Sequence, residues 1–126
     1  MSSVFRHLGF YVNDIDIGIP FYNILGYEEF YRAKENWPEF SGDIDILKMR
    51  NNRDGSIIEF IGNSCFPSEN SGVHAAFTVD NMVEICKKLR NNKVIFIVEP
   101  KTINKKVVVS FCVDPYGFKI ELVQEL

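Results

Sequence analysis

The chain has no excess of positive charge, only two histidines and no long apolar run, and these features restrict the classes of protein to which it can belong. The 126 residues carry a net charge of −3, whereas proteins that bind nucleic acid usually present a basic face. No apolar run approaches the roughly 18–20 residues that span a bilayer, and the first residues contain no apolar signal segment. We therefore expect a cytoplasmic protein that has neither a nucleic-acid partner nor a membrane partner.

Cysteine is present three times, an odd number, without the Cys-x-x-Cys spacing of metal and redox motifs. Cys86 falls on an apolar helical stripe and Cys112 falls in a strand-like segment, so we expect both to be small core residues. Cys65 falls in a polar linker, where we expect it to be exposed. The cysteines therefore provide no recognisable metal or redox motif.

An internal repeat is the most informative feature that the chain does contain. The aligned pairs are His7 with His74, Phe10 with Phe77, Val12 with Val79 and Glu59 with Glu121. Self-similarity of this kind indicates a repeated supersecondary unit. Each half therefore carries one histidine near its start and one glutamate near its end.

Residue patterns predict the order β-α-β-β-β in each half, and hence an α+β fold. In the first half we expect strands at Val4–Val12, Tyr27–Lys34, Asp43–Met49 and Ser56–Ile61, and a helix between Asp14 as N-cap and Gly26 as C-cap. In the second half we expect strands at Val73–Val79, Val94–Val98, Lys106–Val113 and Phe118–Gln124, and a helix capped by Asp80. Loops are expected at 35–42, 62–72 and 99–105. Pro20 requires that the first helix either begins near Gly18 or bends.

The paired histidines and glutamates have the chemistry of metal ligands. Strand alternation places Glu59 on the same face as Ile57 and Ile61, and a carboxylate on a core-like face costs several kcal/mol unless it is paired or bound to a metal. A single strand histidine is more often a hydrogen-bonded core residue, but matched positions in a repeat favour ligation. Two imidazoles and two carboxylates, His7, Glu59, His74 and Glu121, suit Zn²⁺, Ni²⁺, Co²⁺, Mn²⁺ or Fe²⁺.

Several segments of the chain resemble a known group of proteins. They are His7–Asp14, Pro20–Tyr27, Gly72–Asp80 and Asp114–Leu122, with the patterns F-Y-x-x-L-G and D-P-x-G-x-x-I-E-L. These segments are similar to the vicinal oxygen chelate superfamily, also described as the glyoxalase/bleomycin resistance/dioxygenase family, to which glyoxalase I (lactoylglutathione lyase) belongs. The resemblance implies a single domain, 1–126, in which tandem βαβββ modules, 1–65 and 70–126, form a curved mixed sheet around a metal cleft. It also implies a homodimer with shared active sites.

The resemblance further implies an activity and a set of site residues. The activity is that of a divalent-metal-dependent lyase/isomerase of the glyoxalase I type, which transfers a proton through a metal-bound enediolate on a 2-oxoaldehyde–thiol adduct. The metal ligands fall on His7, Glu59, His74 and Glu121, with Glu121 as the catalytic base and Glu59 as ligand or second acid/base.

Two further positions are assigned to substrate binding by the same resemblance. Asn63 matches a residue that contacts glutathione, and Tyr11 stands where small glyoxalases have an arginine. The glycine-rich segment of those enzymes is replaced here by Pro100–Lys106.

Other functions within the superfamily remain open at this stage. Another proton-transfer enzyme, such as an acyl-CoA or sugar epimerase, would use the loop lysines Lys101, Lys105 and Lys106 to meet a phosphate. A ring-cleaving dioxygenase or a thiol transferase usually has two histidines and one glutamate, unlike the full set here. A non-catalytic small-molecule-binding module usually loses ligands, and this chain retains all four.

Overall fold

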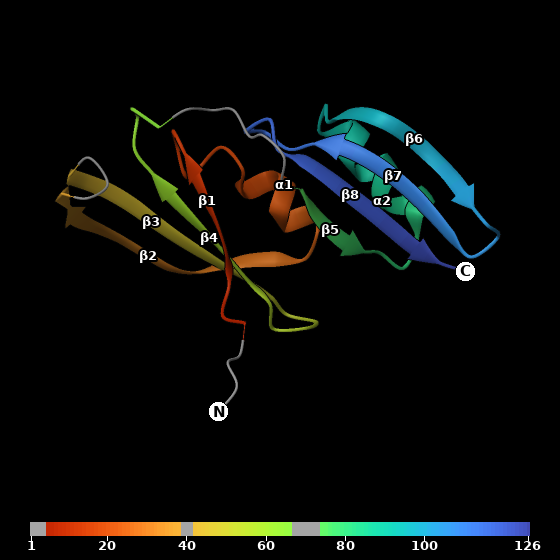
Figure 1. Cartoon of the computed structure of the whole chain (residues 1–126), viewed down its shortest axis with the longest axis horizontal. Coiled ribbons are helices and arrows are strands. Elements are labelled where there is room, and N and C mark those ends of the chain that lie inside the picture. The colour runs from red at the N-terminus through yellow and green to blue at the C-terminus, as the bar shows by residue number, and fades with distance from the viewer. Residues whose placement is uncertain (1–4, 39–41, 67–73) are drawn as a thin grey trace. The chain divides into compact units, whose positions relative to one another are not determined.

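The computed structural model describes residues 5–38, 42–66 and 74–126. The chain divides into two compact units, Met1–Ser68 and Glu69–Leu126, each built on a four-stranded mixed sheet (Figure 1). The predicted α+β fold with tandem βαβββ modules is confirmed. That the two modules form a single domain stays a prediction, and the expected structure at 1–4, 39–41 and 67–73 lies outside the described residues.

Both units have the same connectivity. Unit 1 contains β1 (Leu8–Val12), α1 (Ile19–Ile24), β2 (Tyr27–Trp37), β3 (Gly42–Asn51) and β4 (Ile57–Gly62). Unit 2 contains β5 (Ala75–Thr78), α2 (Met82–Asn91), β6 (Ile95–Ile103), β7 (Val107–Val113) and β8 (Lys119–Glu125). The strand orders are β1-β4-β3-β2 and β5-β8-β7-β6, and in each sheet the first strand lies parallel to the last strand of its own unit.

Helix α1 begins near Gly18 and does not have Pro20 in its interior, which was one of the two possibilities that the sequence left open. The helix begins at Ile19, so Pro20 lies in the first turn, where its missing N–H costs nothing. The N-cap is Gly18 and the C-cap is Leu25, which corrects the expected caps Asp14 and Gly26. Gly26 follows the C-cap with φ +94°, a conformation that glycine adopts without strain.

Helix α2 begins one residue later than expected, because Asn81 and not Asp80 is its N-cap. Asn81 has an extended backbone, and its side-chain oxygen accepts a hydrogen bond from the Glu84 N–H at 3.0 Å. The buried side chains of the helix are Met82, Cys86 and Leu89. This is the apolar stripe that the sequence predicted.

Two predicted loops are shorter than expected because the strands before them are longer. Strand β2 continues to Trp37, and strand β3 begins at Gly42. Strand β6 runs through Pro100 to Ile103, with register shifts between Phe96 and Lys101. Neither helix in the described part of the chain has the length and apolar character that a membrane crossing requires.

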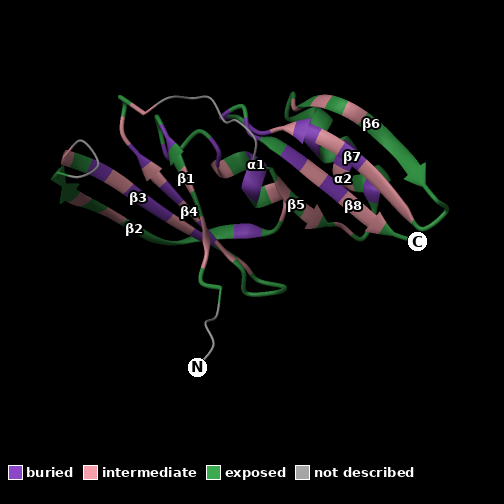
Figure 2. Ribbon diagram, in the orientation of Figure 1, coloured by how far each residue is buried: buried purple, intermediate pink, exposed green. Residues whose placement is uncertain are grey.

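One face of the sheet in unit 1 forms the core against α1. The ring centroid of Tyr22, from α1, lies 5.2 Å from that of Phe60 and 6.5 Å from that of Phe10, and the Phe10 and Phe60 rings stack at 5.6 Å. Buried residues alternate with less buried ones along β4, as Figure 2 shows. Ile58 and Phe60 therefore face the core, whereas Ile57, Glu59 and Ile61 face the other side.

Replacing Phe60 with alanine tests this core assignment. Phe60 has no exposed surface, so Phe60→Ala should lower the free energy of unfolding by about 3–5 kcal/mol. Phe5→Ala is the matched control, because Phe5 is 80% exposed, and its effect should stay within about 0.5 kcal/mol. Urea unfolding of both variants measures the difference. A Phe60→Ala effect as small as that of the control would show that the ring is not buried.

Candidate functional site

The parallel pairing of β1 with β4 places His7 beside Glu59. His7 lies immediately before β1, and Gly9 is the register partner of Glu59 across the β1–β4 ladder. As a result, His7 Nε2 lies 3.2 Å from Glu59 Oε1. The sequence separates these two residues by most of unit 1, and the sheet topology brings them together.

Unit 2 builds the same pair by the same route. His74 lies immediately before β5, and Ala76 is the register partner of Glu121 across the β5–β8 ladder. His74 Nε2 lies 3.0 Å from Glu121 Oε1. In both units the ladder partner of the glutamate is the residue two positions after the histidine, so the repeat seen in the sequence is also a repeat in geometry.

Both pairs are partly accessible. The exposed fractions of the side chains are 26% for His7, 12% for Glu59, 47% for His74 and 23% for Glu121. Glu59 faces away from the α1 core, but it shares its face of the sheet with the buried side chains of Ile44 and Ile46, so its surroundings are apolar as expected and the carboxylate is paired with His7. A half-buried carboxylate with an imidazole beside it is accessible to a small ligand and partly shielded from water.

The two pairs differ in what lies next to the glutamate. Lys48 is the register partner of Glu59, and its Nζ lies 3.8 Å from Glu59 Oε2. At the equivalent position in unit 2, Phe111 is the register partner of Glu121, and its ring lies edge-on to that of His74 at 5.6 Å. Glu59 therefore has an ammonium group beside it, whereas Glu121 has an aromatic ring. Sequence reasoning overlooked Lys48, because at the offset that matches Glu59 with Glu121 it aligns with Ser110, and only the strand register makes it equivalent to Phe111.

Tyr11 and Asn63 lie near the end of the β1–β4 ladder. Tyr11 is 50% exposed, is the register partner of Ile61, and has its ring edge-on to Phe66 at 5.7 Å. Asn63 donates from Nδ2 to the Asp43 carbonyl at 2.9 Å and accepts from the Cys65 N–H at 2.8 Å. Tyr11 thus lies on the same side of the sheet as Glu59, while the Asn63 side chain links β4 to β3.

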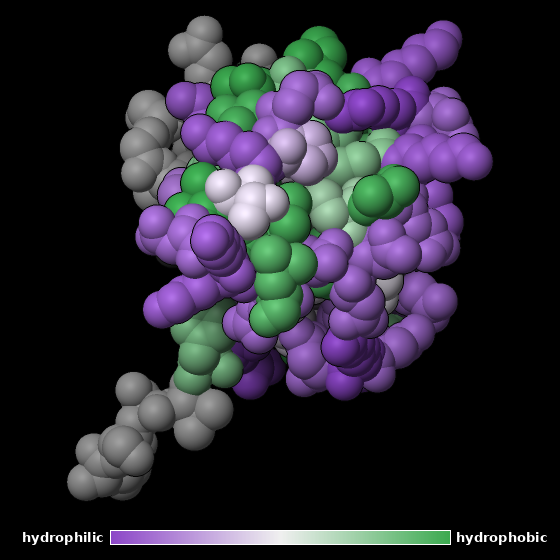
Figure 3. Space-filling view, turned by 90° about the vertical axis from the view of Figure 1, so that its right-hand side faces the viewer, coloured by the Kyte–Doolittle hydropathy of each residue, from purple (hydrophilic) through white to green (hydrophobic). Residues whose placement is uncertain are grey.

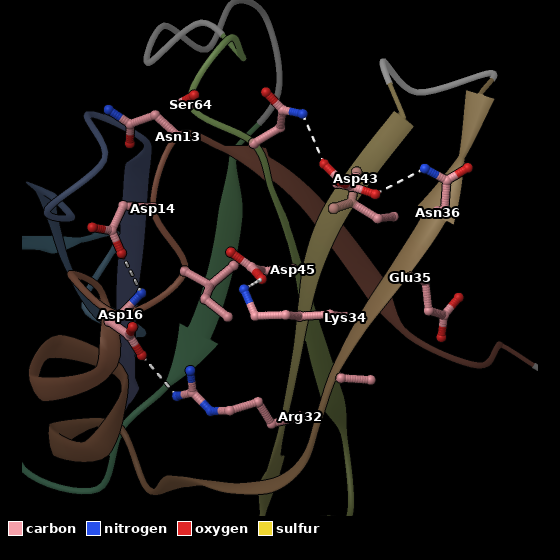
Figure 4. A pocket seen from close by; sticks show the side chains of 14 residues that line it. Asn13, Asp14, Asp16, Arg32, Lys34, Glu35, Asn36, Asp43, Asp45 and Ser64 are labelled. Atoms are coloured by element: carbon pink, nitrogen blue, oxygen red, sulfur yellow. Dashed lines mark hydrogen bonds and ion pairs between the residues drawn. The ribbon is translucent and has the colours of Figure 1, made fainter.

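An open groove of about 1050 Å³ lies on the other side of the sheet in unit 1. The side chains that cross it pair as Arg32 with Asp16 (2.7 Å), Lys34 with Asp45 (2.9 Å) and Asn36 with Asp43 (2.8 Å). Figure 4 shows these three pairs, with Glu35 pointing away from Arg32 and Lys34. Because the groove and the His7–Glu59 pair lie on different sides of the sheet, we place the candidate site at the pair and not in the groove.

The two buried cysteines do not contribute a nucleophile to this site. Cys86 and Cys112 are buried and Cys65 is exposed, as the sequence predicted. Burial raises the pKa of the Cys112 thiol to about 12 and also raises the pKa of Cys86. Both core thiols are therefore protonated, and hence weakly nucleophilic, at neutral pH.

The donor types at the two pairs fit a divalent metal ion. Imidazole nitrogens and carboxylate oxygens are ligands of Zn²⁺ and of its neighbours in the first transition row. A Cβ at Gly9 would lie 3.9 Å from both Glu59 Oε1 and His7 Cδ2, so the missing side chain leaves one side of that pair open. No group of three or more His, Cys, Asp or Glu ligands occurs among residues 5–38, 42–66 and 74–126. Each unit thus supplies one imidazole and one carboxylate.

Comparison with curated proteins gives relatives over most of the chain. A lactoylglutathione lyase from Salmonella typhimurium is 30% identical over 118 residues, which covers 90% of this chain and 86% of that protein. A lactoylglutathione lyase from Escherichia coli O157:H7 is also 30% identical and covers 90% of this chain and 87% of its own length. No protein-family model matches the chain.

Comparison with solved structures gives the same fold at lower identity. A glyoxalase family protein from Bacillus cereus has a TM-score of 0.83 at 19% identity and covers 99% of this chain and 97% of its own. A fosfomycin resistance protein from Listeria monocytogenes (TM-score 0.77, 19% identity) covers 100% of this chain and 96% of its own. The trypanothione-dependent glyoxalase I of Leishmania major (TM-score 0.72, 23% identity) covers 98% and 88%. With the repeated histidine–glutamate pair on this fold, the chain belongs to the glyoxalase/bleomycin resistance/dioxygenase family of the vicinal oxygen chelate superfamily.

Proposed function

We propose that the protein is a divalent-metal-dependent lyase/isomerase of the glyoxalase I type, acting on a 2-oxoaldehyde–thiol adduct. The observation that carries the proposal is the duplicated pair, His7 with Glu59 and His74 with Glu121, at matched register positions. The 30% identity to lactoylglutathione lyases over 118 residues supports the same reaction class.

His7, Glu59, His74 and Glu121 would hold one Ni²⁺, Zn²⁺, Co²⁺, Mn²⁺ or Fe²⁺ ion per site. When bound, the ion supplies a positive charge that polarises substrate oxygens and stabilises negative charge developing on them. Histidine binds a metal ion as the neutral imidazole, so in the proposed site the charge of the two carboxylates would balance that of a divalent ion.

Glu121 is the group to which we assign proton transfer. It would take the proton from the substrate carbon and return it to the neighbouring carbon, which is general acid–base catalysis by a positioned carboxylate. Glu59 already balances the ammonium of Lys48 at 3.8 Å, whereas Glu121 lies opposite Phe111. This difference favours Glu121 as the base and Glu59 as a ligand or second acid/base.

We also propose that two chains form a C₂ homodimer with shared active sites, in the cytoplasm. Each chain provides two half-sites of two ligands, and an isologous dimer would complete two equivalent four-ligand sites. Hydrophobic side chains lie among hydrophilic ones on the face in Figure 3. In strand β6, Ile95 and Ile97 are 71% and 50% exposed, which leaves apolar surface for a partner to cover.

Metal analysis combined with an isomerisation assay tests the proposed function. Purified protein should contain close to one divalent ion per four-ligand site, and it should convert the hemithioacetal of methylglyoxal and a thiol to the thioester. A chelator should abolish turnover, and adding back the ion should restore it.

Comparing glutathione with other thiols, in the wild type and in Tyr11→Arg, identifies the thiol. A gain with glutathione in Tyr11→Arg would indicate a different natural thiol. Protein that binds no divalent ion and turns over no adduct would contradict the proposal.

A further inference from the structure

Lys48 lies in a small cavity beside the His7–Glu59 pair and has no counterpart in the other unit. The cavity has a volume of about 250 Å³ and is lined by residues that include Tyr31, Trp37, Ile44, Ile46, Lys48 and Glu59. All of these residues belong to unit 1. The wall is therefore largely aromatic and aliphatic, with a cation and a carboxylate at one end.

The Lys48 ammonium is held in place by two contacts. Its Nζ lies 3.8 Å from Glu59 Oε2 and 5.0 Å from the ring centroid of Tyr31, within the range of a cation–π interaction. The side chain is only 23% exposed. Placing a charge in a partly buried apolar setting costs free energy, so a hydrophobic residue would stabilise this position more simply.

Unit 2 has the same position in its sheet without a cation. Phe111 occupies the position of Lys48 in the β7–β8 ladder, and the same sheet forms around it. A cation opposite the glutamate is therefore not required by the βαβββ fold. Its presence in unit 1 alone points to a requirement of the site.

We propose that Lys48 binds an anionic group of the substrate, a carboxylate, phosphate or phosphonate, while the substrate's apolar part lies against Trp37 and Tyr31. At 3.8 Å the contact of the Lys48 ammonium with Glu59 is longer than a hydrogen bond, so the ammonium keeps donors for a second anionic partner. A divalent ion on Glu59, as in the proposed function, would share the charge of that carboxylate and increase this need. An acid group on the substrate supplies such a partner through a charge-assisted hydrogen bond.

A second acidic side chain, that of Glu35, also lines the cavity. Glu35 accepts a hydrogen bond from Trp37 Nε1 at 2.7 Å, which leaves its charge beside the indole and not beside the ammonium. This inference names the substrate class of the proposed active site and rests on that proposal for the reaction, but not for binding. The binding of an anion to Lys48 is therefore measured separately from turnover.

Ligand binding in the cavity can be followed by tryptophan fluorescence, because Trp37 is the single tryptophan of the chain and lines the cavity. The probe is phenylphosphonate, which carries an anionic head on an aromatic ring, and benzyl alcohol is its neutral counterpart. Titration of chelator-treated protein should change Trp37 fluorescence in a saturable way. Lys48→Met should weaken phenylphosphonate binding by about 10- to 100-fold, the loss expected for one charge-assisted contact, and should leave benzyl alcohol binding unchanged.

Three further variants test whether the positive charge of Lys48 is responsible for binding. Lys48→Arg should keep the affinity within about threefold, because the charge remains. Lys34→Met should have no effect, because Lys34 is 88% exposed and pairs with Asp45 on the other side of the sheet. Glu59→Gln should strengthen phenylphosphonate binding, since it removes the carboxylate that competes for Lys48, and adding Lys48→Met should cancel that gain.

Two results would overturn the inference. One is equal phenylphosphonate affinity in the wild type and Lys48→Met, including no saturable binding in either. The other is a Lys48→Met variant that changes only the affinity for Zn²⁺, which would make Lys48 a residue that positions Glu59. Failure of the proposed function has a different signature, in which the protein binds no metal and turns over no adduct but still binds phenylphosphonate through Lys48.

Discussion

Glu121→Gln should lower turnover by about 10²–10⁴-fold, the usual contribution of a positioned acid or base, while the bound metal is retained. Glutamine has nearly the same volume as glutamate and keeps an oxygen that can reach both a metal ion and His74, whose Nε2 lies 3.0 Å from Glu121 Oε1. Only the basic carboxylate is lost. Initial rates on the thiol adduct, with metal content measured on the same samples, separate the two effects.

Glu59→Gln is the matched control for that experiment. Glu59 occupies the equivalent position in β4, has the same kind of imidazole partner and differs by having Lys48 beside it. If Glu121 is the base, Glu59→Gln should lower turnover less than Glu121→Gln. Full activity in Glu121→Gln, with a large loss in Glu59→Gln, would reverse the two roles.

Removing either histidine should release the metal. His7→Ala and His74→Ala each delete one imidazole of the proposed four-ligand set, and we expect the affinity for the divalent ion to fall by about 10²-fold or more, since even residues that only support a ligand contribute about 10- to 100-fold. Activity should fall as a consequence and should return in part at high metal concentration. Calorimetric titration of the metal-free protein measures the affinity directly.

The control for the histidine variants is Asp45→Asn, which changes a residue on the other side of the unit 1 sheet. Asp45→Asn removes a carboxylate that pairs with Lys34 at 2.9 Å, so it changes the charge of unit 1 without touching the pair. Its metal affinity should equal that of the wild type. If His7→Ala lowers the affinity while His74→Ala does not, the metal site uses unit 1 alone and the proposal of a shared four-ligand site is wrong.

The repeat made much of the fold and the two pairs predictable from the sequence. Matching His7 with His74 and Glu59 with Glu121 was enough to expect one imidazole and one carboxylate at equivalent places, and the ladder partners Gly9 and Ala76 show why the match is geometric. The order β-α-β-β-β followed from periodicity and turn chemistry. Whether the two pairs bind one ion stays a prediction.

The end of strand β6 was predicted wrongly from the local sequence, which indicated a loop at 99–105. Pro100 and the polar residues after it indicated a loop, because proline cannot donate to a ladder. The structure continues the strand to Ile103, and the strand order β5-β8-β7-β6 places β6 at the edge of its sheet, where one side of the backbone needs no partner strand. The register shifts on both sides of Val98 accommodate the irregular backbone. Position in the sheet is a tertiary property, and the sequence of the segment does not contain it.

The predicted helix caps were wrong for a related reason. Asp14, Asp80 and Asn81 all have side chains that cap helices well, and choosing among them needs the backbone path into the helix. Asp14 instead accepts a hydrogen bond from the Asp16 N–H at 2.9 Å within the turn before α1.

Lys48 was overlooked because a lysine in a strand is usually solvated, and only the ladder shows that it faces Glu59.

The parallel pairing of each first strand with the last strand of its unit has a consequence for synthesis and folding. On the ribosome, His7 emerges early, but the chain that carries it has no partner strand until Gly62 has been made, since β1 pairs only with β4 in the sheet order. Such long-range closure is the slow part of folding, because its entropy cost is met before its contacts form. A chain stopped at Asn51 would contain β2 and β3 but no His7–Glu59 pair. In the proposed metal site, an ion therefore meets the His7–Glu59 pair only after unit 1 has been made.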